Sequence, residues 1–300
     1  MRFGVDLGGT KTEIIALAGS GGEIFRRRIP TVRDYAGTVR AIASLVAEAD
    51  AETGQRGSVG LAIPGTVSRH TGLIKNANSV WLNGQPFARD LEAALKRPVR
   101  LANDANCFAL SEATDGAAED ASIVFGVILG TGVGGGVVVN GQVLGGAHGI
   151  GGEWGHNPLP GMTVQEWSQV SDCYCGQRGC IEQWLSGPAL AARFVSGNPS
   201  PIDDPGWNAE AIAASTAPEA RAAMAIWMEQ LGRALASVVN ILDPDVIVLG
   251  GGLSNIERLY RELPALVERH AFTPETPPRI VRNIHGDSSG VRGAAWLWDR

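Results

Sequence analysis

The sequence has few cysteines and no excess of basic residues. Its 300 residues include 4 cysteines, and 25 Lys and Arg stand against 31 Asp and Glu, which gives a formal net charge of -6 at pH 7. A protein that binds the phosphate backbone of nucleic acid needs a basic face, so this charge argues against such a partner. A secretory signal is also missing, because Asp6 and Lys11 interrupt any apolar run near the N-terminus. We therefore expect a cytoplasmic protein that binds no nucleic acid.

Charged residues are absent from residues 121–152, which contain no Asp, Glu, Lys or Arg. Such a stretch could be a membrane span. However, it is dense in glycine and contains Asn140-Gly141, a dipeptide typical of hairpin turns. We therefore expect strands of a buried sheet and no membrane segment. With 44% apolar residues, a chain of 300 residues can bury a large core and form two lobes.

Glycine is abundant, with 40 residues, and it gathers after apolar strands. Three such strands, expected at 2–7, 123–129 and 246–249, run into Gly8-Gly9-Thr10, Gly130-Thr131-Gly132 and Gly250-Gly251-Gly252. A strand, a Gly-Thr turn and a second strand occur near the start of each half of the chain, which suggests two related lobes. Periodicity and turn residues also predict helices at 35–51, 87–95, 104–113 and 220–242, a last helix at 290–298, and a surface loop at 196–207.

Glycine turns of this kind can hold phosphate, because several backbone N–H groups can converge on an anion. The first turn is preceded by Asp6, a carboxylate that could hold Mg²⁺ through water, and is followed by Lys11. It is not a Walker A loop, since no helix follows. Residues 130–135 match G-x-G-x-x-G, but a strand and turn come next, so an NAD site is not expected. The remaining alternative is that these clusters are only tight turns.

One set of residues has the composition of a metal site: His156, Cys173, Cys175 and Cys180. Zinc takes four ligands of thiolate and imidazole type, and Cys₃His is a common closed structural site. Disulfides are disfavoured, because nothing directs the chain to an oxidising compartment. An ion here would tie together two segments that carry Glu153 and Glu182, and so fix both carboxylates. The alternative is free thiols beside an unrelated histidine.

Asp104 is the candidate general base. Phosphoryl transfer to an alcohol needs a carboxylate that accepts the hydroxyl proton. Asp104 follows a strand expected at 99–102 and opens a predicted helix, so rigid elements would hold it. Aspartate is also a favoured N-cap, and the residues alone leave both roles open.

Together these motifs resemble a known superfamily. Residues 6–11, 129–132 and 249–252 are similar to the first phosphate, second phosphate and adenosine motifs of actin-like ATPases and sugar kinases. Residues 153–156 and 173–182 resemble the signature of the ROK family of bacterial sugar kinases, and the resemblance runs from about Phe3 to Leu297. It implies an α/β, two-lobed actin-like ATPase fold with duplicated lobes and a central cleft for ATP and sugar. We place the lobes at residues 1–115 with 288–300 and at residues 116–287.

The resemblance also implies roles for single residues, with ATP, Mg²⁺ and structural Zn²⁺ as cofactors and a homodimer as the assembly. Asp104 is expected to be the general base. The expected sugar contacts are Asn103, Asp104, Glu153, His156, Glu182, Gly65 and Asn78. The expected ATP-binding residues are Asp6, Gly8, Gly9, Thr10, Lys11, Gly130, Thr131, Gly132, Gly250, Gly251 and Gly252. His156 is expected to use its other ring nitrogen on zinc, together with Cys173, Cys175 and Cys180.

The ROK family includes kinases for several hexoses and also transcriptional repressors. A repressor carries a helix-turn-helix before the first phosphate motif, and Asp6 lies too near the start for that, so we do not expect a repressor. Residues 76–87, 154–160 and 286–295 resemble bacterial fructokinases of the manno(fructo)kinase type. We therefore expect fructose to be converted to fructose 6-phosphate, with side activity on mannose. The alternatives are an N-acetylglucosamine or glucose kinase, whose pattern is largely shared, and a sugar-binding protein that has lost turnover.

Overall fold

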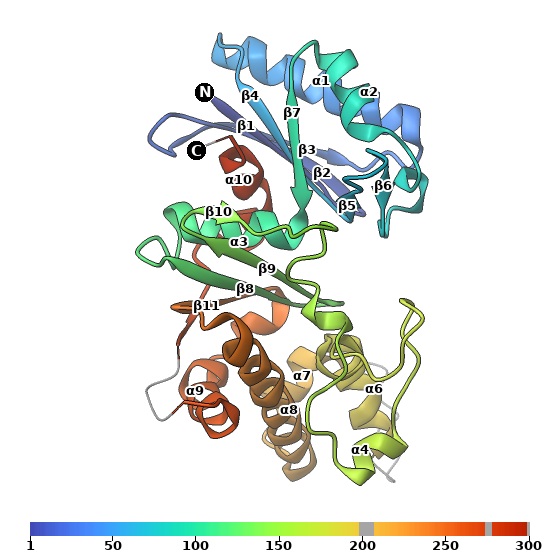
Figure 1. The fold of residues 1–300 in the computed structure, drawn as a ribbon, viewed down its shortest axis with the longest axis vertical. Coiled ribbons are helices and arrows are strands. Elements are labelled where there is room, and N and C mark those ends of the chain that lie inside the picture. Colours follow the sequence, from blue (N-terminus) through green and yellow to red (C-terminus); the bar gives the residue numbers. More distant parts are fainter. Residues whose placement is uncertain (198–206, 274–277, 299–300) are drawn as a thin grey trace. The chain divides into compact units, whose positions relative to one another are not determined.

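The computed structural model describes residues 1–197, 207–273 and 278–298, so most of the loop expected at 196–207 lies outside the described residues. The chain forms two compact units, coloured by sequence in Figure 1. The first unit contains residues 1–122, 136–152 and 284–300, and the second contains 123–135 and 153–283. The lobe bounds given above stay a prediction. Among the described helices, none has the length and apolar character needed to cross a bilayer.

The first unit is built on a five-stranded sheet in the order β3-β2-β1-β4-β7. Its strands are β1 (Arg2–Leu7), β2 (Lys11–Leu17), β3 (Glu23–Pro30), β4 (Ser58–Ile63) and β7 (Val99–Asn103). The three neighbours β1, β4 and β7 are parallel, whereas β2 is antiparallel to both β1 and β3. Asp6 in β1 pairs with Ala62 in β4, and Ala62 pairs with Ala102 in β7. The register therefore brings the ends of β1 and β7 to one edge of the sheet, where α/β proteins place their ligands.

Helices cover both faces of this sheet (Figure 1). They are α1 (Tyr35–Thr53), α2 (Phe87–Leu95), α3 (Asp104–Asp115) and α10 (Ser289–Trp296). The first unit also contains the short elements β5 (Thr66–Val67), β6 (Ile74–Lys75), η1 (Val80–Leu82) and η4 (Gly286–Ser288), and β10 (Gln142–Val143), which pairs in the second sheet. Alternate β1 residues Phe3, Val5 and Leu7 form a buried cluster with side chains of α1 and α2. On the opposite face α10 lies close to the strands, because a Cβ on Gly4 would come within 2.0 Å of the Val291 carbonyl oxygen.

The second sheet has the order β10-β9-β8-β11-β12, with β8 (Ile123–Leu129), β9 (Val133–Val139), β11 (Val246–Gly250) and β12 (Arg279–Arg282). The two sheets are built alike. In the first sheet, β1, β2 and β3 lie in chain order, and β4 and β7 extend the sheet parallel to β1. In the second sheet, β8, β9 and β10 lie in chain order, and β11 and β12 extend the sheet parallel to β8. This repeat agrees with the duplication that the sequence predicted. The helices of the second unit are η2 (Trp154–His156), α4 (Val164–Ser168), α5 (Glu182–Leu185), α6 (Gly187–Gly197), α7 (Ala209–Ala214), α8 (Pro218–Leu242), η3 (Gly252–Asn255) and α9 (Arg258–His270).

Candidate functional site

The first glycine turn joins β1 to β2 and lies beside a small cavity. Gly8 N donates to the Lys11 carbonyl oxygen at 3.0 Å, which closes the turn. The cavity has a volume of about 220 Å³ and is lined by Asp6, Gly8, Thr10, Lys11, Glu13 and Arg28. Four of these residues were predicted to bind ATP or Mg²⁺. The sequence analysis missed Glu13 and Arg28, which the strand register could have indicated, because Asp6 pairs with Glu13 and Glu13 pairs with Arg28.

The charge of Asp104 acts on Asp6. Burial is the main cause that raises the pKa of Asp6, and the charges of Asp104 and Glu13 raise it further, to about 7, against a lowering effect of Arg28. The structure therefore brings together the predicted base and the predicted Mg²⁺-side carboxylate. Carboxylate oxygens are the ligands that Mg²⁺ prefers, so the donors at this edge of the sheet fit the ion.

Asp104 is the first residue of α3, and the residue before it caps the helix. The Asn103 side-chain oxygen accepts from Ala105 N at 2.9 Å, and Asp104 Oδ1 accepts from the same N–H at 2.8 Å. The N-cap is thus Asn103, which separates the two roles that the sequence left open. Asp104 as a residue is exposed to solvent, but many protein atoms surround its carboxyl group. The reduced hydration of the charged form raises the pKa of Asp104 above its ordinary value. A raised pKa makes the carboxylate a better proton acceptor.

Two further predicted sugar contacts belong to the same unit as Asp104. Gly65 is buried and lies two residues after the end of β4. Asn78 is exposed and lies between β6 and η1. Their role in sugar binding stays a prediction.

The second glycine turn is fastened to the chain that follows the cysteines. The Gly130 carbonyl oxygen accepts from Gly187 N at 2.8 Å, and Val133 N donates to Glu182 Oε2 at 2.9 Å. A Cβ on Gly132 would lie only 2.6 Å from that carboxylate oxygen, so a side chain here would displace the Glu182 carboxylate from its present position. Glu182, which was predicted only as a sugar contact, therefore also holds a predicted phosphate turn.

The third glycine turn lies beside the second. β11 runs parallel to β8, and Gly250 pairs with Ile128. Gly251 has φ +79, and a Cβ there would come within 2.4 Å of the Leu129 carbonyl oxygen. The structure thus brings residues 130–132 and 250–252, both predicted to bind ATP, to neighbouring strand ends.

The four predicted metal ligands form one cluster. The donor atoms of His156, Cys173, Cys175 and Cys180 all lie within 4.8 Å of one another. Cys173 Sγ is 3.6 Å from His156 Nδ1, and Cys175 Sγ is 3.6 Å from Cys180 Sγ. Ligands about 2.0–2.3 Å from a tetrahedral zinc ion lie about 3.5–3.8 Å from one another. Both the spacing and the donor types therefore fit zinc.

A tyrosine that the sequence analysis did not select stands beside this cluster. Tyr174 lies between two cysteines of the cluster, and its hydroxyl group is 3.0 Å from His156 Nε2. Aromatic residues next to metal ligands have no fixed role, so no sequence signal pointed to it.

Comparisons with known proteins identify the family. The family model "ROK family" matches residues 2–300. The chain is 42% identical over 306 residues to N-acetyl-D-glucosamine kinase of Aliivibrio salmonicida (strain LFI1238), with 99% of both chains covered. It is 42% identical over 304 residues to the protein of the same name from Escherichia coli O127:H6 (strain E2348/69 / EPEC), again with 99% of both covered. The chain belongs to the ROK family.

Solved structures of the ROK family agree in fold. A ROK hexokinase from Thermus thermophilus is 33% identical with a TM-score of 0.84, covering 99% of this chain and 97% of that one. A ROK family glucokinase from Streptomyces griseus, in complex with glucose and AMPPNP, is 26% identical with a TM-score of 0.77, covering 99% and 98%. This ROK family protein therefore has the two-lobed actin-like ATPase fold and is an ATP-dependent sugar kinase.

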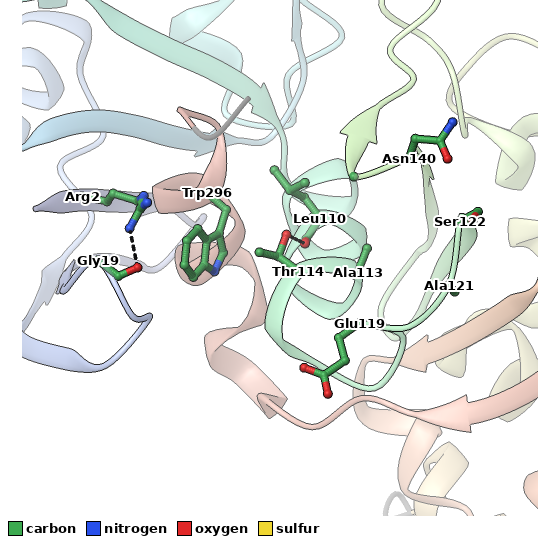
Figure 2. Close-up of a pocket in the computed structure, with 11 residues that line it drawn as sticks. Arg2, Gly19, Leu110, Ala113, Thr114, Glu119, Ala121, Ser122, Asn140 and Trp296 are labelled. Atoms are coloured by element: carbon green, nitrogen blue, oxygen red, sulfur yellow. Dashed lines mark hydrogen bonds between the residues drawn. The ribbon is translucent and has the colours of Figure 1, made fainter.

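A larger cavity of the ROK kinase, of about 480 Å³, lies in the first unit (Figure 2). Arg2, Glu119 and Trp296 are among the residues that line it. The Arg2 guanidinium donates to the carbonyl oxygens of Ala18 and Gly19 and lies 4.7 Å from the centre of the Trp296 ring. Among the described residues, no predicted site residue lines this cavity, so it does not belong to the candidate active site.

Proposed function

We propose that this ROK family kinase transfers the γ-phosphoryl group of ATP to the 6-hydroxyl of N-acetyl-D-glucosamine. The observation that carries the proposal is the 42% identity, over 99% of both chains, to two proteins named N-acetyl-D-glucosamine kinase. This replaces the expectation of fructose, which came from residues 76–87, 154–160 and 286–295. Fructokinases and N-acetylglucosamine kinases share most of that pattern, so the pattern did not separate them.

Asp104 is the proposed general base. Its raised pKa suits a proton acceptor, and Asn103 is the N-cap of α3, so Asp104 is not needed in that position although its Oδ1 also accepts from Ala105 N. In the reaction Asp104 accepts the proton of the 6-hydroxyl while that oxygen attacks the γ-phosphorus, and ADP leaves in line. Asn103 is proposed to contact the sugar, together with Gly65 and Asn78.

The glycine turns are proposed to bind ATP. The turns at residues 8–10 and 130–132, with the Lys11 ammonium group, would hold the phosphates, and residues 250–252 the adenosine. Gly8 N and Gly130 N already donate to the carbonyl oxygens of Lys11 and Gly132, so the contacts would come from the N–H groups of residues 9–10 and 131–132. Asp6 would hold Mg²⁺ through water, because its carboxylate lies at the cavity beside the first turn. Magnesium, when bound, neutralises charge on the phosphates.

Glu153, His156 and Glu182 are proposed to bind sugar hydroxyls from the second unit. The cluster of His156, Cys173, Cys175 and Cys180 is proposed to hold zinc as a structural ion, because four protein ligands close the coordination shell. His156 would then be fixed through Nδ1, and the chain from Cys180 to Glu182 would be fixed with it. The homodimer stays a prediction.

A panel of four sugars tests the proposal. N-Acetyl-D-glucosamine, glucose, mannose and fructose are each incubated with ATP and Mg²⁺, and ADP release is followed in a coupled assay. We expect kcat/KM for N-acetyl-D-glucosamine to exceed the other values by about tenfold or more, which corresponds to about 1.4 kcal/mol of transition-state binding. A higher value for fructose would restore the first expectation. No turnover with any sugar would favour a sugar-binding protein.

A further inference from the structure

Both ring nitrogens of His156 have a partner in this structure. Nδ1 faces the cysteine cluster, 3.6 Å from Cys173 Sγ. Nε2 lies 3.0 Å from the Tyr174 hydroxyl oxygen. The two rings meet edge to face, with an interplanar angle of 88° and centroids 5.2 Å apart. The nitrogen that points away from the cluster is therefore already hydrogen bonded to the protein.

His156 Nε2 can serve one strong partner at a time. A metal on Nδ1 takes the lone pair of that nitrogen, so the neutral ring carries its proton on Nε2. A single N–H makes one good hydrogen bond, and with the metal on Nδ1 the Tyr174 hydroxyl oxygen, 3.0 Å away, would accept it. A sugar hydroxyl that binds His156 needs the same N–H. Tyr174 and the sugar therefore compete for it.

The Tyr174 backbone is fixed, whereas its side chain is free to leave. Cys173 N donates to the Gln177 carbonyl oxygen at 2.8 Å, and Gly176 N donates to that of Cys173 at 3.0 Å, so a turn holds the residue. The Tyr174 side chain nevertheless belongs to a residue that is 72% exposed. A rotamer change would move the ring into solvent with little loss of packing.

The Tyr174 hydroxyl contacts one of the second-unit side chains that are proposed to bind the hexose. That side chain is His156, whose Nε2 lies 3.0 Å from the hydroxyl oxygen. Tyr174 itself lies between Cys173 and Cys175, in the segment that the proposed zinc ion would hold. The hydroxyl group therefore occupies the side of His156 that a sugar hydroxyl would need.

We propose that Tyr174 gates the sugar site: its hydroxyl group accepts the His156 Nε2–H in the free enzyme and is displaced when the hexose binds. The inference rests on the proposed function, because it takes His156 as a sugar contact. Displacing one neutral hydrogen bond weakens sugar binding by about two- to tenfold. The gate keeps His156 Nε2 hydrogen bonded while no sugar is present.

The substitution Tyr174→Phe tests the gate, because it keeps the ring and removes only the hydroxyl group. Sugar binding is measured by calorimetry on the full zinc-loaded chain, and KM and kcat by the coupled assay. We expect the sugar Kd and KM to fall about two- to tenfold, with the effect in KM rather than in kcat. Tyr35→Phe is the matched control, because it removes a tyrosine hydroxyl bonded to Asp90 at 2.7 Å in the first unit, and it should leave KM unchanged.

Each other outcome overturns the gate. An unchanged KM would show that the sugar does not compete with the Tyr174 hydroxyl, and a raised KM would show that this hydroxyl binds the sugar directly. Zinc content is measured on every sample, and Tyr174→Leu gives a second variant without the hydroxyl if Tyr174→Phe loses metal. The test uses whichever sugar the wild-type enzyme phosphorylates best. The sugar panel therefore decides the proposed function, and the ratio of variant to wild type decides the gate.

Discussion

Glu182 accepts a hydrogen bond from Val133 N at 2.9 Å. This bond joins the chain after the last cysteine of the cluster to the second glycine turn. The proposed sugar site and phosphate site of the second unit therefore share one carboxylate, which lies two residues after the proposed zinc ligand Cys180. We therefore expect a substitution of Glu182 to lower the affinity for ATP as well as the affinity for the sugar.

Glu182→Gln should weaken ATP binding even without sugar. The amide replaces a charged acceptor by a neutral one, and a hydrogen bond to a charged group contributes about 1.5–3 kcal/mol. We expect the Kd of a non-hydrolysable ATP analogue to rise about tenfold, measured by calorimetry. Glu268→Gln, an exposed change on α9 of the same unit, is the control. If Glu182→Gln left the nucleotide affinity unchanged, Glu182 would have no role in ATP binding, and only its proposed role in sugar binding would remain.

Asp104→Asn should abolish most turnover and leave the fold intact. The amide cannot accept the hydroxyl proton, so kcat should fall about a thousandfold or more. Asn103 remains as the N-cap of α3, so the midpoint of thermal unfolding should stay within a few degrees of wild type. Turnover near the wild-type rate would remove Asp104 from the role of base.

Zinc removal, or Cys175→Ala, should abolish sugar binding while ATP still binds weakly. The ion would fix His156 and, through residues 180–182, the Glu182 carboxylate, so its loss frees two proposed sugar contacts. Metal content by atomic emission and sugar affinity by calorimetry are measured on the same samples. A chelated, metal-free sample that keeps full sugar affinity would contradict the proposed role of the ion.

Gly293→Ala should destabilise the first unit strongly. A Cβ on Gly293 would lie 1.7 Å from the Cys107 carbonyl oxygen, so α10 and α3 would have to separate. Overpacking of this kind costs about 1–3 kcal/mol or more of the free energy of unfolding. Gly19→Ala is the control, because nothing lies within 4 Å of its added Cβ. Equal denaturation midpoints for the two variants would show that the helices tolerate the change.

Glu166 should make stability depend on pH in the acid range. Burial acts to raise its pKa, but hydrogen bonds from Arg233 (2.5 Å), Thr163 N (2.7 Å) and Gln230 (2.9 Å) outweigh burial and lower the pKa from 4.5 to about 2. A carboxyl group with a depressed folded-state pKa stabilises the fold above its unfolded pKa. That stabilisation is lost as pH falls through the folded pKa.

The measurement compares wild type with Glu166→Gln by chemical unfolding at pH 7, 4.5 and 3. The difference in the free energy of unfolding should be up to about 3 kcal/mol at neutral pH and should shrink as the pH falls from 4.5 toward 2. A difference that does not change with pH would show that ionisation of Glu166 is not the source.

Elements with strong local signals were predicted well. The helix expected at 35–51 is α1, Tyr35–Thr53, and the Asp34 side chain caps it by accepting from Gly37 N at 2.7 Å. The helix expected at 87–95 has the same bounds in the structure, and the one expected at 220–242 begins at Pro218. These signals come from neighbours along the chain, so the sequence contains them directly.

Features that depend on distant residues were not predicted. The Asp6–Glu13–Arg28 row follows from strand register, and the Glu182–Val133 bond joins residues far apart in the sequence. Which residue caps α3 depends on the backbone at the end of β7, and both Asn103 and Asp104 are good N-cap residues. The preferred sugar was missed for another reason, since kinases for related hexoses share the same motifs.

Asn103 is the N-cap of α3, whereas Asp104 is the proposed general base, and this separation of roles has a practical consequence. Because Asn103 caps the start of α3 and remains when Asp104 is replaced, an inactive enzyme should be obtainable without an unfolded one. Such an enzyme would let nucleotide and acceptor be soaked in together and remain unreacted, so the ternary complex that precedes phosphorylation becomes a target for crystallography.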